Sequence, residues 1–201
     1  AIFLYVGVEV GIPNFMNLFA TSSEIGIDPT VAGSIVGTYW FLMMIGRLCG
    51  ASIGAKVSSR AMLTVVSTVG IALVLGAIFC ADNILVNMPV FKSDISFGFA
   101  QVPVNVMLLI LCGLCTSVMW GGIFNLAVEG LGKYTAAASG LFMVMVCGGG
   151  ILPLIQGGVA DFAGFLNSYW VIALGLAYIL FYAAIGSKNV NTDIPTDDYE
   201  A

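Results

Sequence analysis

The sequence predicts an all-α membrane protein, and three observations support this prediction. Hydrophobic residues make up 60% of the 201 positions and charged residues only 8%, whereas a soluble domain is typically about 25% charged. The mean hydropathy is +1.05. Six apolar segments are each long enough to cross a ~30 Å hydrocarbon core as a helix that rises about 1.5 Å per residue. We therefore expect a six-helix transmembrane bundle.

The expected spans follow one another with mostly short polar connections. The first carries a single charge, Glu9, and the second begins at Pro29, a favoured first residue of a helix. The longest connection, residues 82–102, contains the apolar run ILVNMPVF, which could lie on the membrane surface. The expected spans are residues 1–21, 29–53, 61–81, 103–128, 135–160 and 165–186.

Basic residues predict how the bundle is oriented. The second and fourth connections hold Lys56, Arg60 and Lys133, and Lys188 follows the last span. The other three connections together hold only Lys92. Since cytoplasmic loops carry an excess of Lys and Arg, we expect the even connections and both chain ends to be cytoplasmic in the inner (plasma) membrane.

The two ends of the chain lead to separate expectations. Residue 1 already lies inside a hydrophobic run, without a charged leader, so we expect a piece of a longer polypeptide. We take residues 1–187 as the membrane bundle. Residues 188–201 are polar and acidic, and we expect them to form a flexible cytoplasmic tail.

Composition also argues against several kinds of chemistry. The sequence has no histidine, so a histidine-based metal site, proton relay or catalytic triad is excluded within this chain. Its five cysteines all lie in apolar runs, where we expect them to pack as small hydrophobic residues. No basic patch suggests nucleic acid. We therefore expect neither an enzyme nor a metal site.

Glu9 is the most informative single residue. Counted inward from Thr21, it lies about 18 Å deep, near the bilayer midplane. An acid there costs about 2.5–3.5 kcal/mol on insertion scales, so it should face a water-filled cavity or a partner. Either a functional site or a structural hydrogen bond of the protonated acid would satisfy it, and we favour the functional site.

The residues that follow Glu9 strengthen the functional interpretation. Pro13 has no N–H to donate to the Glu9 carbonyl, so we expect a bend and a free carbonyl there. Asn14 and Asn17 add two carboxamides to the same helix. A bent helix at mid-membrane with a carboxylate and two carboxamides could bind a polyol.

Further candidate binding residues lie on other spans. Trp120 offers an apolar face that stacks on a sugar ring and one N–H donor, and Asn125 follows it. Tyr39 lies near mid-depth of the second span and could line a cavity or pack against helices. In the fifth span, Gln156 follows three glycines and a proline, an interruption typical of transporter sites.

Three charges near the helix ends are candidates for a gate. Glu129 and Lys133 are four residues apart and could form a simple helix-end pair. Glu129 could instead pair with Arg47 across helices at the inner mouth of a cavity. Arg47 could also extend to the membrane surface. The sequence does not decide between these alternatives.

Four segments resemble sugar:proton symporters of the major facilitator superfamily, in the fucose permease and glucose/galactose transporter branch. The segments are YVGVEVGIPNF (5–15), GRLCGA (46–51), IFNLAVEGLGKYT (123–135) and GGGILPLIQGGVAD (148–161). The resemblance covers almost the whole chain. It implies the C-terminal half of a twelve-helix fold, helices seven to twelve, with an N-terminal six-helix half as partner.

The resemblance also implies roles for individual residues. Glu9, Trp120 and Asn125 match polar or aromatic positions that face the family's cavity, and Arg47 and Glu129 match positions in a charge cluster at the inner gate. Gly121 stands where relatives often have proline, which leaves the identity of the sugar open.

The resulting functional expectation is secondary active transport of a hexose or 6-deoxyhexose through the lipid bilayer by alternating access. The resemblance implies protons as the coupling ion and no cofactor. The alternative is an exporter of drugs or other metabolites in the same superfamily, and a non-transporting membrane sensor is less favoured.

Overall fold

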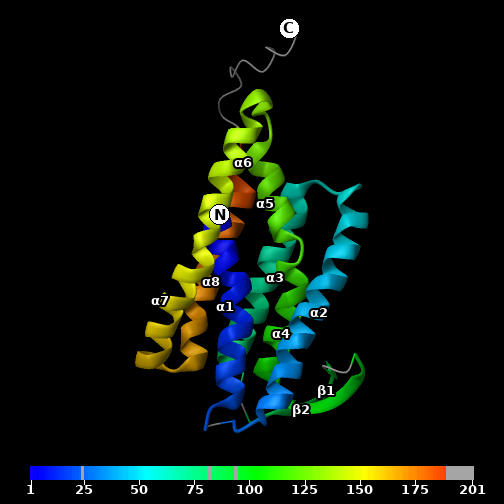
Figure 1. The fold of residues 1–201 in the computed structure, drawn as a ribbon, viewed down its shortest axis with the longest axis vertical. Helices are drawn as coiled ribbons and strands as arrows, with labels where there is room; N and C mark the ends of the chain where they lie inside the picture. Colours follow the sequence, from blue (N-terminus) through cyan, green and yellow to red (C-terminus); the bar gives the residue numbers. More distant parts are fainter. Residues whose placement is uncertain (24, 81–82, 93–94, 189–201) are drawn as a thin grey trace.

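The computed structural model describes residues 1–23, 25–80, 83–92 and 95–188. Six helical spans run roughly along one axis and form an elongated bundle (Figure 1). Each is long and apolar enough to cross a membrane, and the six-helix prediction is confirmed. The spans are Ile2–Thr21, Pro29–Gly54, Ser59–Phe79, Val104–Val128, Gly132–Ala163 and Phe165–Gly186. Of the predicted tail, only Lys188 lies within the described residues.

The first three spans are single helices, α1 (Ile2–Thr21), α2 (Pro29–Gly54) and α3 (Ser59–Phe79). Asp28 caps α2 by accepting the Thr30 N–H at 2.8 Å, and this hydrogen bonding holds the pKa of the exposed carboxyl below its usual value. Ser58 caps α3 in the same way through the Ala61 N–H.

The fourth and fifth spans are each interrupted. The fourth consists of α4 (Val104–Thr116) and α5 (Met119–Val128), separated at Ser117 and Val118. The fifth consists of the 3-10 turn Gly132–Tyr134, α6 (Thr135–Val144), a second 3-10 turn (Met145–Cys147) and α7 (Gly148–Ala163). The sixth is α8 (Phe165–Phe181), which ends in a π turn at Tyr182–Gly186.

The long connection is a β-hairpin, which differs from the all-α expectation. Strands β1 (Leu85–Phe91) and β2 (Phe97–Pro103) pair antiparallel at one end of the bundle (Figure 1). The apolar run for which the sequence allowed a place on the membrane surface forms strand β1. The physical reason is its period-2 pattern: Met88 and Val90 are buried, whereas Asn87 and Pro89 are exposed.

The hairpin is fixed to α2 by one hydrogen bond and by aromatic packing. The Phe91 N–H donates to the Thr38 hydroxyl at 2.8 Å. The Phe91 ring stacks on Phe41 with a centroid separation of 4.8 Å. The hairpin thus packs against the N-terminal half of α2.

Helix α1 lies at the centre of the packing, against α7 and α8 on one side and α2 and α4 on the other. A Cβ at Gly148 would overlap the backbone carbonyl of Phe3, so glycine there permits close approach of α7 and α1. The Tyr169 hydroxyl donates to the Ile12 carbonyl at 2.9 Å and ties α8 to α1.

Candidate functional site

A cavity of about 700 Å³ lies in the half of the bundle that carries the connection between α2 and α3. It is lined by one residue of α1, by a face of α2, by the start of α3, and by the break between α4 and α5 together with α5 itself. Four of the predicted site residues line it: Glu9, Arg47, Trp120 and Asn125. The structure therefore brings together residues that are far apart in the sequence.

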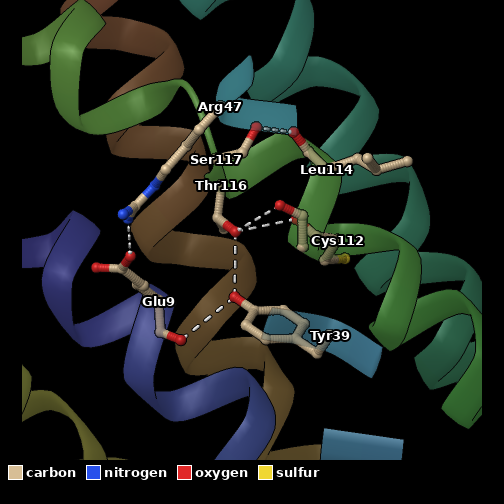
Figure 2. A network of polar contacts seen from close by, with 8 residues as sticks. Glu9, Tyr39, Arg47, Cys112, Leu114, Thr116 and Ser117 are labelled. Carbon is tan, nitrogen blue, oxygen red and sulfur yellow. Dashed lines mark hydrogen bonds and ion pairs between the residues drawn. The ribbon is translucent and has the colours of Figure 1, made fainter. Parts of the chain in front are cut away.

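Glu9 and Arg47 form an ion pair in this cavity. The Arg47 Nη2 donates to Glu9 Oε1 at 2.9 Å, and the arginine side chain extends from α2 to the acid (Figure 2). The Glu9 side chain is 13% exposed and that of Arg47 56% exposed. The acid within the span thus has a cationic partner, as its insertion energy requires.

Of the alternatives that the sequence left open for Arg47, the structure shows neither the pairing with Glu129 nor an extension to the membrane surface, because Arg47 pairs with Glu9. Glu129 is the C-cap of α5 and lines a second hollow of about 530 Å³ together with Ser58, Arg60 and Asn125. Arg47 reaches instead to the less exposed acid on α1, because an acid within a span gains more from a counter-charge than an exposed acid at a helix end.

The carbonyl that Pro13 leaves free also has a partner. The Tyr39 hydroxyl donates to the Glu9 carbonyl oxygen at 3.2 Å and lies 3.1 Å from the Thr116 hydroxyl (Figure 2). Tyr39 is fully buried, so it supports the Glu9 backbone from behind the cavity. This places Tyr39 outside the cavity lining, although the sequence also allowed a lining role.

The break in the fourth span occurs at two consecutive hydroxyl residues. The Ser117 hydroxyl donates to the Leu114 carbonyl at 2.6 Å, and the Thr116 hydroxyl lies 3.2 Å from the Cys112 carbonyl (Figure 2). Such bonds from side chain to backbone compete with the helical ladder and bend helices. Sequence reasoning did not select this Thr-Ser pair, which was the available signal for the break.

Trp120 packs at the cavity wall just beyond this break. Its ring makes edge contacts with Tyr5, at a centroid distance of 6.1 Å, and with Phe142, at 5.6 Å. Sequence reasoning did not select Tyr5, which lies one helical turn before Glu9. The Tyr5 hydroxyl is buried and has no hydrogen-bond partner among the described residues.

The remaining predicted residues are distributed around the bundle. Asn125 is exposed and donates from Nδ2 to the Ser59 hydroxyl at 3.3 Å. Gln156 is buried away from the cavity, where its Nε2 lies 3.4 Å from the Ser168 hydroxyl and its Oε1 approaches Gly11. The nitrogen of Lys133 lies 5.6 Å from the centre of the Tyr134 ring.

Asn14 and Asn17 lie on α1 outside the cavity lining. Asn14 is exposed and Asn17 partly so. At about 100° per residue, Asn14 points about 140° away from Glu9 around the helix. The two carboxamides therefore do not form part of the cavity wall.

Comparison with characterised proteins identifies relatives over almost the whole chain. It is 30% identical over 189 residues to a glucose/galactose transporter of Brucella abortus, which covers 94% of this chain and 41% of the relative. It is 31% identical over 192 residues to a putative glucose/galactose transporter of Helicobacter pylori, covering 93% of the chain and 42% of the relative. The L-fucose-proton symporter of Escherichia coli is 24% identical over 187 residues.

Two solved structures have the same fold. One is a major facilitator superfamily transporter in the outward conformation, with a TM-score of 0.77 and 23% identity. The other is a variant of the Escherichia coli fucose:proton symporter, with a TM-score of 0.78 and 24% identity. Each match covers 94% of this chain and 41% of the other. No family model matches the sequence.

The chain therefore spans less than half the length of the relatives that it matches. Its six spanning helices make it a multi-pass membrane protein. It is a homologue of these glucose/galactose transporters and has the fold of one half of a major facilitator superfamily transporter.

Proposed function

We propose that the protein to which this chain contributes six helices transports a hexose or 6-deoxyhexose across a membrane by alternating access. The observation that carries the proposal is the cavity in which Glu9, Arg47, Trp120 and Asn125 meet. The names of the relatives, which are glucose/galactose transporters and an L-fucose-proton symporter, support the same substrate class.

In this proposal each lining residue has a role that suits a sugar. The carboxylate and guanidinium of the Glu9–Arg47 pair can each bond to ring hydroxyls, and the Asn125 amide can both donate and accept. The Trp120 indole packs against the apolar face of the ring. A small set of placed polar groups on an otherwise apolar wall is typical of small-molecule sites.

Alternating access requires a second bundle on the open side of the cavity. A six-helix N-terminal half of the same polypeptide fits this role, because the relatives are more than twice as long as the chain. The interrupted fourth span, with its break at Ser117 and Val118, forms part of the cavity wall. Discontinuous helices of this kind line substrate sites in transporters.

Proton coupling, which we propose by resemblance, has a candidate group in Glu9. Protonation of Glu9 removes the negative charge that holds Arg47 at 2.9 Å. The arginine is then free to bond to a sugar hydroxyl or to leave the cavity. Protonation of Glu9 would thus release Arg47 for the sugar, so that proton binding and sugar binding favour each other, as symport requires.

Uptake of labelled glucose, galactose and fucose by the full-length protein tests the proposal. We expect accumulation of at least one of these sugars and its loss when a protonophore collapses the proton gradient. Accumulation that survives the protonophore would contradict proton coupling, and no accumulation of any monosaccharide would contradict sugar transport.

Two asparagine variants test whether the cavity binds the sugar. Asn125→Ala should weaken sugar binding roughly 2- to 10-fold, the effect of one neutral hydrogen bond. Asn167→Ala is the matched control, because Asn167 donates to the Ala163 carbonyl at the turn between α7 and α8, outside the cavity lining. Equal effects of the two substitutions would place the sugar elsewhere.

A further inference from the structure

A third hollow, a groove between α2 and α3, is almost entirely apolar. Its volume is about 390 Å³. Helix α4 packs against both α2 and α3. Its residue Leu114 and the break that follows it, Ser117 and Val118, form the floor of the groove. The sides are formed by α2 residues that include Cys49 and Ile53, and by α3 residues that include Ala61 and Val65, all of them exposed.

This groove uses a different face of α2 from that of the substrate cavity. The cavity is lined by Arg47, Gly50, Ala51 and Gly54, and the groove by Gly46, Cys49, Gly50 and Ile53. At about 100° per residue, the mean directions of the two sets differ by about 100° around the helix. The groove therefore opens at about a right angle to the cavity around α2, and not toward the open side of the cavity, where the second bundle is expected.

The length and apolar character of α2 and α3 indicate what surrounds the groove. Both α2 and α3 are long and apolar enough to cross a membrane, so the groove lies along the hydrocarbon of the bilayer. An open apolar groove at that depth is filled by lipid chains, because water finds no hydrogen-bond partners there.

A basic residue stands at one end of the groove. Lys56 is exposed and lies in the short connection between α2 and α3, between Ile53 and Val57, which both line the groove. Arg60, which is also near this connection, bonds instead to the Ser187 carbonyl and lines the hollow beside Glu129. A lysine at the membrane surface next to an apolar groove complements a lipid with an anionic headgroup.

We propose that the groove between α2 and α3 binds one acyl chain of an anionic phospholipid, with the phosphate of its headgroup at Lys56. The bound chain would lie directly behind the substrate cavity. The substrate cavity and the groove share four lining residues: Gly50, Met62, Ser117 and Val118. A Cβ at Gly50 would overlap the Val118 side chain. The proposal does not depend on the identity of the transported substrate.

Native mass spectrometry of the full-length protein tests this site. The detergent-purified protein is titrated with phosphatidylglycerol or with phosphatidylcholine, and the tightly bound lipids are counted. We expect Ala61→Trp, which fills the groove, to lose the tightest phosphatidylglycerol. Lys56→Gln should keep a lipid but lower the preference for phosphatidylglycerol about fivefold, the contribution of one lysine near an anionic surface.

Matched controls lie at the same end of the bundle. Ala184 and Lys188 are exposed near the end of the last span and do not line the groove, so Ala184→Trp and Lys188→Gln should bind lipid like the unmodified protein. Unchanged binding in Ala61→Trp would overturn the site. An unchanged preference in Lys56→Gln would overturn the anionic headgroup.

A second pair of variants protects the test against misfolding of Ala61→Trp. Cys49 lines the groove from α2, whereas Cys147 is equally exposed on the fifth span but outside the groove. Cys49→Trp should lose the bound lipid and Cys147→Trp should keep it. Loss in both variants, or in neither, would contradict the proposal.

Discussion

Glu9 shows how a single acid is accommodated within a membrane span. Its carboxylate pairs with Arg47. Its backbone carbonyl, to which Pro13 has no N–H to donate, accepts a hydrogen bond from the Tyr39 hydroxyl. The sequence predicted both the depth of the acid and the free carbonyl. It could not predict either partner, because each lies at least 30 residues away and only tertiary packing brings it to α1.

The first prediction concerns the ion pair. In a double-mutant cycle with Glu9→Gln and Arg47→Gln, we expect a coupling of about 1–2 kcal/mol in the free energy of unfolding. Exposed pairs contribute about 0–1 kcal/mol and the loss of one partner of a buried pair costs about 3–5 kcal/mol. This pair lies between the two cases, because Glu9 is 13% and Arg47 56% exposed. Unfolding of the purified full-length protein by SDS titration measures the coupling.

A parallel cycle with Glu129→Gln is the control for the ion pair. Arg47 pairs with Glu9 and not with Glu129 in the structure, so the two substitutions should add within about 0.5 kcal/mol. A larger coupling for Arg47 with Glu129 than with Glu9 would restore the gate that the sequence suggested.

The second prediction compares two buried tyrosine hydroxyls. Tyr39→Phe should destabilise the fold by about 1–2 kcal/mol, because the Glu9 carbonyl would lose its donor in a buried environment. Tyr5→Phe should cost less than Tyr39→Phe, because the Tyr5 hydroxyl, although close to the Glu9 carboxylate, makes no hydrogen bond of good geometry within the described part of the chain. The free energy of unfolding of each variant is the measurement. Equal losses of stability in the two variants would contradict the role of the Tyr39 hydroxyl as the donor to the Glu9 carbonyl.

Pro13→Ala provides an independent check on Tyr39. Alanine restores an N–H that can donate to the Glu9 carbonyl within the helix. The loss caused by Tyr39→Phe should therefore be smaller in a Pro13→Ala background. An unchanged loss would show that the tyrosine acts mainly through Thr116.

At the scale of helices, span length and polarity could be predicted from the sequence, whereas their interruptions could be predicted only in part. All six spans are present, since about 20 consecutive apolar residues leave few other folds. The break at Ser117 and Val118 depends on where two hydroxyls bond, which apolar periodicity does not show. The hairpin was missed because its period-2 pattern occupies a connection assumed to be irregular.

The third prediction concerns the contact between α1 and α7. Gly148→Ala should destabilise the fold by about 1–3 kcal/mol, the usual effect of overpacking, because its Cβ would overlap the Phe3 carbonyl. Gly150→Ala is the matched control: it has open space around it and should be neutral or stabilising by up to about 1 kcal/mol, since alanine favours a helix. The midpoint of thermal unfolding should therefore fall for Gly148→Ala and not for Gly150→Ala, and an unaffected Gly148→Ala protein would contradict the close approach.

At the scale of the whole molecule, the two ends of the bundle differ in charge and in architecture. The hairpin, which holds Lys92 next to β1, lies at one end (Figure 1). The connection between α2 and α3 and the connection between α5 and α6 lie at the opposite end (Figure 1), and these hold Lys56 and Lys133. Fold alone does not decide which end faces the cytoplasm, whereas the distribution of basic residues predicts that the end with Lys56 and Lys133 does.

The last prediction follows from this asymmetry. In a full-length protein without native cysteines, a cysteine at Ile95, which is 82% exposed next to the hairpin strands, should react with a membrane-impermeant maleimide in intact cells. A cysteine at Tyr134, which is 48% exposed beside Lys133, should react only after the cells are permeabilised. Both sites are accessible and differ only in the end of the bundle on which they lie, so a difference in labelling reports orientation. The reverse pattern would place the basic end outside, and it would also move the Glu129 hollow and the lipid groove at Lys56 to the outer leaflet.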